Sequence, residues 1–202
     1  MRVKTDEKRD EILAVAAEVF REQGYERASM AAISTRLGGS KSTLYGYFES
    51  KADLFVAVML DAGSREMGDA IADLTLARGD LRSTLLHFSE RYVDFVVSER
   101  AITLHRTVIG ESSQSDIGQR FFEAGPRQAY ERVEAFLAEA MAAGLLRRAS
   151  TERAAHHFLG LVNAETLMPA LYGVPLTRKQ TRTMVRDAVD VFLAAYAVPA
   201  GG

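Results

Sequence analysis

The sequence predicts an all-α protein of about nine helices, and three observations lead to that prediction. Apolar residues recur mostly at intervals of three and four, the spacing of one helix face. No convincing stretch alternates apolar and polar residues between turn residues, as a half-buried strand would. With 202 residues, 48% of them hydrophobic, the chain can bury a substantial core in one or two domains.

Composition narrows the class of protein. The chain has no cysteine, which excludes disulfides, thiolate metal sites and cysteine nucleophiles, and it contains no apolar stretch long enough to cross a membrane. We therefore expect a soluble, cytoplasmic protein. The net charge is −2, and residues 1–51 carry a balance of only +1, so charge alone does not suggest a nucleic-acid partner.

Capping and turn residues close in the sequence predict the first three helices. A helix over residues 6–23 begins at a Thr5 or Asp6 cap and ends at Gly24, where a left-handed residue is favoured. Ser29 can cap a second, short helix that stops at Gly38-Gly39, and Ser40 can cap a third. A long helix then begins at Lys51.

That long helix is expected over residues 51–76, weakened at Gly63 and Gly68. The remaining helices are expected at about residues 80–97, 99–111, 116–143, 151–172 and 177–197. Within residues 116–143, Gly125-Pro126 indicates a kink or a restart, because proline removes a backbone donor.

The last two helices, 151–172 and 177–197, are apolar on more than one face. The residues concerned include Phe158, Leu161, Leu167 and Met168 in one helix and Met184, Val191, Phe192 and Leu193 in the other. A helix that is apolar around most of its circumference must be covered on two sides. We expect the second side to form a homodimer interface, the alternative being a central position in a single core.

The stretch GGSKSTLYGYFESK, residues 38–51, allows two interpretations. A phosphate-binding loop requires Gly directly before Lys and a preceding strand, but here Ser40 precedes Lys41 and the upstream residues are helical in pattern. A helix-turn-helix unit fits better. Ser34 supplies the small residue at the helix crossing, Gly38 the turn, and Leu44 an inward apolar residue.

In that unit the third helix presents its polar residues outward. Lys41, Ser42 and Thr43 stand in the first turn, the part that meets base edges in a major groove, and Tyr45 and Tyr47 follow. Lys51 opens the next helix, whose free N–H groups also favour a phosphate. The alternative is a stable three-helix unit whose polar face is merely solvated.

Residues 9–55 resemble the DNA-binding domain of the TetR family of bacterial transcriptional regulators. The matching features are Gly-Tyr after the first helix, Ser-x-x-x-Ile in the second, Gly-x-Ser-x-x-Thr-Leu-Tyr-x-Tyr-Phe at the third, and the Ser-Lys that follows. The resemblance implies that Tyr45 and Tyr47 touch mainly the DNA backbone and that Lys51 holds phosphate. The predicted DNA-binding residues are Ser29, Lys41, Ser42, Thr43, Tyr45, Tyr47 and Lys51.

Two positions depart from the family pattern. Gly39 stands where an apolar residue is usual, and Gly46 replaces a larger residue between the tyrosines. Each glycine loosens the helix unit, so we expect the unit to become firmer on DNA.

The resemblance also implies two domains: residues 1–50 as the helix-turn-helix domain and residues 51–202 as a helical effector-binding and dimerisation domain. The stretch from VIGESSQ to AMAAGLLR is similar to an AefR-like subtype. Effector pockets in helical bundles are mostly apolar. The candidate effector-binding residues are Met59, Met67, Phe88, Tyr92, His105, Phe122 and Phe158, each of which has ordinary core packing as its alternative explanation.

Catalytic and metal sites are not expected. His156 and His157 point about 100° apart on a helix, and Glu152 with His156 supplies only two ligands. Neither G-x-S-x-G nor H-E-x-x-H occurs, so we expect no enzyme, no metal and no cofactor.

The function that follows is a homodimeric repressor bound to a near-palindromic double-stranded DNA operator and released by a small, mainly apolar effector. Two alternatives stay open. One is a helical scaffold or small-molecule binding protein that no longer reads DNA. The other is a regulator that activates transcription or does not respond to ligands.

Overall fold

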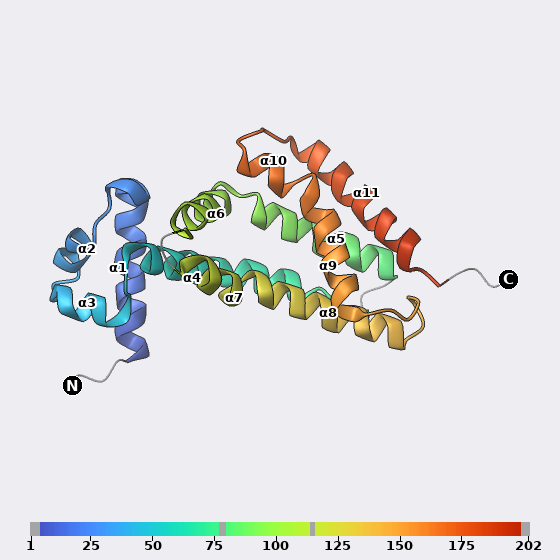
Figure 1. The fold of residues 1–202 in the computed structure, drawn as a ribbon, viewed down its shortest axis with the longest axis horizontal. Coiled ribbons are helices and arrows are strands. Elements are labelled where there is room, and N and C mark those ends of the chain that lie inside the picture. The colour runs from blue at the N-terminus through green and yellow to red at the C-terminus, as the bar shows by residue number, and fades with distance from the viewer. Residues whose placement is uncertain (1–4, 77–79, 114–115, 199–202) are drawn as a thin grey trace. The chain divides into compact units, whose positions relative to one another are not determined.

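The computed structural model describes residues 5–76, 80–113 and 116–198, of which residues 62–66 are described by their backbone alone. Within these ranges the chain forms eleven helices and no strand, which confirms the all-α prediction (Figure 1). Packing divides the chain into two compact units. Unit 1 comprises Met1–Ala62 with Arg106–Phe121, and unit 2 comprises Gly63–His105 with Phe122–Gly202.

The helices of the N-terminal part are α1 (Asp6–Arg27), α2 (Met30–Arg36), α3 (Lys41–Tyr47) and α4 (Lys51–Ala72). They are followed by α5 (Leu81–Val96), α6 (Glu99–Glu111), α7 (Ile117–Ala124) and α8 (Pro126–Ala142). The last three are α9 (Thr151–Ala164), α10 (Leu167–Leu171) and α11 (Arg178–Tyr196).

Local signals set the helix ends of unit 1. Gly24 has φ 75° and ψ 166°, a conformation that glycine adopts at little cost, and it kinks α1 where the sequence predicts an end. The Ser29 hydroxyl accepts a hydrogen bond from the Ala32 N–H at 3.1 Å, and Ser40 accepts one from Thr43 at 3.1 Å. Both caps confirm the predicted starts of α2 and α3.

The core of unit 1 joins α1, α2 and α3. Its fully buried members include Ile12, Ile33 and Leu44. At the crossing of α2 and α3, the buried Ser34 hydroxyl donates a hydrogen bond of 3.0 Å to the Gly39 carbonyl. The ring of Phe20 packs edge-on against Phe55 at 5.0 Å between centroids, so α1 also contacts α4. Through its hydrogen bond to Gly39, Ser34 ties the turn before α3 to α2.

Unit 2 is built around α5, α9 and α11. Figure 1 shows α9 lying between α8 and α11, and α11 also packs along α5. The rings of Phe88, Phe158 and Phe192 are fully buried, one from each central helix. Phe158 contacts both of the others, with centroid distances of 6.2 Å to Phe88 and 5.0 Å to Phe192. This aromatic cluster forms the centre of the unit.

Two predicted helices are each two helices in the structure. The region expected as one helix over residues 116–143 is α7 and α8, because Pro126 begins α8 at its first position. The region expected over residues 151–172 is α9 and α10. There Pro169 lacks the N–H that a continuous helix would bond to Glu165, and its ring would clash with that carbonyl. The long helix α4 passes Gly63 and Gly68 without a break but ends at Ala72, not at residue 76.

The last helices bury one face strongly and leave the other partly open. Of the apolar residues that predict a second face, Leu161, Leu167 and Leu193 pack against the core of unit 2, whereas Met168 is 48% and Val191 54% exposed. The second apolar face is therefore narrower than the sequence suggests.

Two glycines of unit 1 allow a matched test of the turn. Gly38 has φ 66°, so alanine there is strained, although a Cβ would meet nothing within 4 Å. Gly46 lies within α3, where a Cβ also meets nothing within 4 Å. We expect Gly38→Ala to lower the free energy of unfolding by about 1 kcal/mol. We expect Gly46→Ala to raise it by about 0.5–1 kcal/mol. Denaturant unfolding measures both, and equal signs would contradict this account.

Candidate nucleic-acid interface

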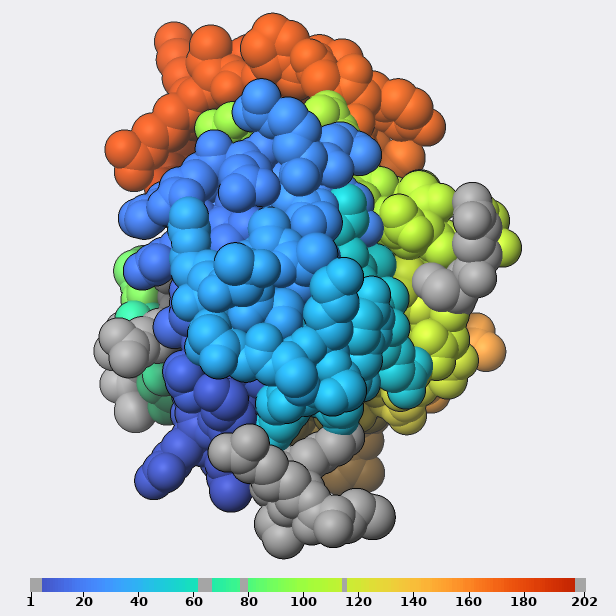
Figure 2. Space-filling view, turned by 90° about the vertical axis from the view of Figure 1, so that its left-hand side faces the viewer, coloured from blue at the N-terminus to red at the C-terminus, as the bar shows by residue number. Residues whose placement is uncertain are grey.

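The outer face of α3 is polar and open to solvent. Leu44 and Phe48 anchor its inner face in the core, and Lys41, Ser42 and Tyr45 lie exposed on the other side, with Tyr45 51% exposed. The lighter blue surface at the centre of Figure 2 belongs to α2 and α3. The tyrosine-bearing helix therefore stands at the surface, as the helix-turn-helix interpretation requires.

The hydroxyl groups at the start of α3 form one small network. The Ser40 oxygen lies 2.8 Å from that of Ser42 and 2.9 Å from that of Thr43, while it also caps the helix. Ser42 and Thr43 are thus held in place near Lys41 at the first turn. Ser29 lies exposed at the start of α2, and its oxygen is engaged in capping that helix.

The two tyrosines of α3 differ in their surroundings. Tyr45 extends into solvent, whereas Tyr47 is half-buried and its hydroxyl oxygen accepts a hydrogen bond of 3.0 Å from the Thr5 N–H. Thr5 is also the N-cap of α1. Tyr47 therefore ties the start of α1 to the end of α3.

Lys51 makes an intramolecular contact that sequence reasoning missed. Its ammonium group donates to the carbonyl oxygens of Tyr25, at 3.0 Å, and of Glu26, at 3.3 Å. It also lies 4.2 Å from the centroid of the Tyr25 ring. Lys51 thereby joins the start of α4 to the end of α1, and its expected contact with a DNA phosphate stays a prediction.

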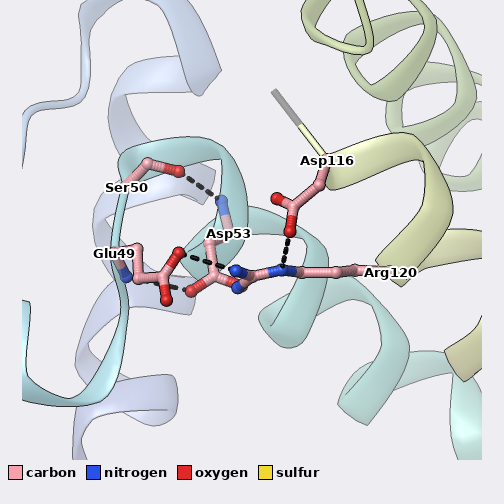
Figure 3. A network of polar contacts seen from close by, with 5 residues as sticks. All are labelled: Glu49, Ser50, Asp53, Asp116 and Arg120. Carbon is pink, nitrogen blue, oxygen red and sulfur yellow. Dashed lines mark hydrogen bonds and ion pairs between the residues drawn. The ribbon is translucent and has the colours of Figure 1, made fainter. Parts of the chain in front are cut away.

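Arg120 is the second residue that sequence reasoning missed (Figure 3). Its guanidinium lies 2.6 Å from Glu49, 3.5 Å from Asp53 and 2.9 Å from Asp116. The hydrogen bonds to Glu49 and Asp116 raise the pKa of Arg120 above its usual value. Glu49 lies in the short connection between α3 and α4. Arg120 therefore links that connection to α7. Its partner Glu49 lies 71 positions away in the chain, so no local pattern could reveal the pair.

A second contact joins α6 to the same unit. The Tyr25 hydroxyl donates a hydrogen bond of 3.3 Å to a Glu111 carboxylate oxygen. Burial, followed by the nearby Glu111 charge, raises the pKa of Tyr25 to about 12. Tyr25 consequently remains a neutral donor at physiological pH. Both α6 and α7 therefore contact the α1–α4 assembly through polar side chains.

The candidate effector-binding residues do not form one cluster in the structure. Met59 belongs to unit 1, and the other six belong to unit 2. Phe88, Tyr92 and Phe158 pack together in the core of unit 2, with Met67 against it. Phe122 is 47% exposed and lies 6.5 Å from the Tyr130 ring, while the His105 ring lies 2.8 Å from the Ala101 carbonyl oxygen. An effector role for these residues stays a prediction.

The described ranges hold no group of three His, Asp or Glu residues placed to bind a metal ion. Nor does any helix within them have the length and apolarity needed to cross a membrane.

A short helix fixed by its apolar face in a three-helix unit, with a polar outer face at the surface, defines a helix-turn-helix DNA-binding protein. Comparison with known proteins gives the family. Residues 12–58 match the family described as bacterial regulatory proteins, tetR family, and residues 83–198 match the AefR-like transcriptional repressor, C-terminal domain. The chain belongs to the TetR family of DNA-binding transcriptional regulators. Its family and fold are those of regulators, not of enzymes.

Individual relatives agree with that assignment. The chain is 37% identical over 101 residues to the HTH-type transcriptional activator FasR of Mycolicibacterium smegmatis, a match that covers 47% of this chain and 43% of that protein. The chain thus spans less than half the length of this curated relative. Among solved structures, the flavonoid-responsive regulator FrrA is 30% identical with a TM-score of 0.74, covering 97% of this chain and all of that one. A TetR-family regulator from Mesorhizobium loti shares the fold at 24% identity, with a TM-score of 0.81 and coverage of 96% and 100%.

The Arg120 network can be tested by its dependence on salt. We expect Arg120→Gln to lower the melting temperature at low ionic strength, because Glu49, Asp53 and Asp116 would then repel one another without a compensating cation. The difference should shrink in 1 M salt, where the Debye length is only about 3 Å. Arg127→Gln, which removes a single exposed pair with Glu131, is the matched control. Equal melting shifts for both variants at both salt concentrations would contradict the proposed role.

Proposed function

We propose that the chain is a homodimeric transcriptional repressor that binds a near-palindromic operator through α3 and leaves it when a small molecule binds unit 2. The single observation that carries the proposal is the polar, exposed face of α3 above the buried Leu44. The description of the matching C-terminal family as a repressor supports the sign of regulation. A DNA-binding regulator acts where the chromosome lies, so a cytoplasmic location rests on this proposal.

Each subunit would place α3 in one half of the operator, and two-fold symmetry of the dimer would match the palindrome. Lys41, Ser42 and Thr43 would face base edges, and Tyr45 and Tyr47 would contact backbone. In this scheme Lys51 keeps its contact with the end of α1 and offers a remaining donor to a phosphate. This assignment makes residues 1–50 the DNA-binding domain and the rest of the chain the regulatory domain.

An activator is the second candidate, because FasR, 37% identical over the matched part, is named an activator. The two candidates share the DNA contact and differ in where the operator lies relative to the promoter. Footprinting on DNA that flanks the gene for this protein, followed by transcription from that DNA with and without the protein, separates them.

The base-reading role of Lys41 has a direct test. We expect Lys41→Ala to change the preference among base-substituted operators by about 1–3 kcal/mol at one base position, if its amino group donates to a guanine edge. Tyr45→Phe should weaken binding to all operators alike, because a backbone contact carries no base information. Lys179→Ala, an exposed lysine of α11, is the control and should leave operator titrations unchanged. Unchanged affinity in the Lys41 and Tyr45 variants would remove α3 as the DNA contact.

The dimer is proposed to form through the outer faces of α9 and α11. Small or apolar residues occur there, among them Gly160 and Ala164 of α9 and Val191 and Ala194 of α11. A Cβ at Gly160 would meet nothing within 4 Å, so a helix of a second copy can approach it. Deleting α11 would also remove Phe192 from the core, and point substitutions are therefore the cleaner test.

We expect Val191→Arg to shift the protein from dimer to monomer in sedimentation, because it would bury an unpaired charge in the interface. Val174→Arg is the matched control. Val174 is 52% exposed against 54% for Val191, but it lies between α10 and α11. A dimer that survives Val191→Arg, or that Val174→Arg disrupts equally, would place the interface elsewhere.

A further inference from the structure

Three polar residues, Ser89, Tyr92 and Asn163, lie in or beside the apolar core of unit 2. Ser89 and Tyr92 occupy the buried face of α5, three positions apart, and Asn163 lies near the end of α9. The Asn163 amide nitrogen donates a hydrogen bond of 3.0 Å to the Tyr92 hydroxyl oxygen. Asn163 is the only asparagine of the chain, and it stands in an otherwise apolar helical turn.

Two atoms of these residues are buried and have no hydrogen-bond partner among the described residues. They are the Ser89 hydroxyl oxygen and the Asn163 amide oxygen. Reversing the Asn163 amide would let Tyr92 donate to the oxygen, but the amide nitrogen would then lack a partner. Either orientation leaves one amide atom unsatisfied, which is rare in folded proteins and costs stability. A group from outside the chain is the natural partner.

The chemistry of that group can be read from its surroundings. Burial raises the pKa of Tyr92 to about 12, and among the described residues the side chains of Tyr92 and Asn163 hydrogen-bond only to each other. A carboxylate placed beside the neutral Tyr92 hydroxyl would therefore be buried without a counter-charge. A neutral hydroxyl, by contrast, both donates and accepts, and it can satisfy Asn163 in either amide orientation.

The apolar part of the ligand can also be specified. The Tyr92 ring is stacked on Phe88, with centroids 5.6 Å apart and planes inclined by 23°. Phe88 is in turn stacked on Phe158, with centroids 6.2 Å apart and planes inclined by 30°. Phe88 and Phe158 are fully buried, so the surroundings of the Tyr92 hydroxyl are apolar, and we expect the remainder of the ligand to be apolar as well.

The backbone near Asn163 departs from regular helix. Asn163 lies in the last turn of α9, and the chain turns at Glu165 and Thr166 before α10 begins. The buried Thr166 hydroxyl closes that turn by donating to the Val162 carbonyl at 2.7 Å. Asn163 thus lies where the regular hydrogen bonding of α9 ends, beside the turn that leads into α10.

We propose that Tyr92 and Asn163 recognise the hydroxyl group of a neutral, mainly apolar effector. This inference rests on the proposed ligand response of unit 2 and specifies its chemistry. The effector is then not purely apolar, because a hydrocarbon would leave the amide of Asn163 unsatisfied. Tyr92 and Asn163 determine specificity, while Phe88 and Phe158 contribute to the apolar surroundings.

Three probes of one shape test the proposal on the full chain by titration calorimetry. These are 4-ethylphenol, ethylbenzene and 4-ethylbenzoate. We expect 4-ethylphenol to bind about tenfold more tightly than ethylbenzene, the effect of roughly one well-made buried hydrogen bond. The benzoate should bind more weakly than the phenol. Equal affinity for phenol and ethylbenzene, tighter binding of the benzoate, or no binding of any probe at millimolar concentration would overturn the proposal.

A double substitution separates recognition from a structural role. Tyr92→Phe with Asn163→Leu replaces both partners by apolar groups of similar size, a change that is often neutral for stability. We expect the melting temperature to be maintained and the preference for 4-ethylphenol over ethylbenzene to disappear. A lower melting temperature with the preference intact would show that the pair only supports the fold. Tyr172→Phe, at a residue 79% exposed, is the control for loss of a tyrosine hydroxyl.

Operator release is measured separately by adding the same probes to the protein–DNA complex. Selective binding of the phenol without release from DNA would support the ligand assignment and refute the proposed mode of regulation. Release by a compound that binds the doubly substituted variant as tightly as the unchanged protein would support the proposed mode of regulation and refute the ligand assignment.

Discussion

The burial of Leu44 is the constraint on which unit 1 depends. Its side chain lies fully inside the core with Ile33 and Ile12, so the opposite side of α3 must face solvent. The Ser34 hydroxyl fixes the preceding turn by its hydrogen bond to the Gly39 carbonyl. Because the helix has only seven residues, one anchored face determines the direction of every other side chain. The polar outer surface of α3 is thus a consequence of the apolar packing beneath it.

Unit 2 combines a tightly packed apolar core with buried polar atoms that lack hydrogen-bond partners in the described part of the chain. The packed rings of Phe88, Phe158 and Phe192 join α5, α9 and α11 into a tightly packed core. The same core retains buried polar atoms of Ser89 and Asn163 without partners, at a cost in stability. Proteins keep such groups where they serve a purpose other than folding, and specific recognition of a small molecule is one such purpose.

The sequence predicts those features that depend on neighbours in the chain. The caps at Ser29 and Ser40, the turn at Gly38 and the inward position of Leu44 follow from residue type and helical spacing. It does not predict contacts between distant segments. Arg120 with Glu49, Lys51 with the Tyr25 carbonyl, and Asn163 with Tyr92 each join separate helices, and only the folded chain brings them together. The break between α9 and α10 follows from a local signal, Pro169, which the predicted single helix over residues 151–172 does not take into account.

Unit 1 is assembled from two separate stretches of chain, Met1–Ala62 and Arg106–Phe121. During synthesis the first stretch leaves the ribosome well before the second. The connection between α3 and α4 therefore gains the Arg120 guanidinium only after all of α5 and α6 has been made. The N-terminal unit therefore reaches its complete form late in translation. For the same reason, an excised N-terminal fragment would retain the acidic side chains of Glu49 and Asp53 but not the cation that neutralises them.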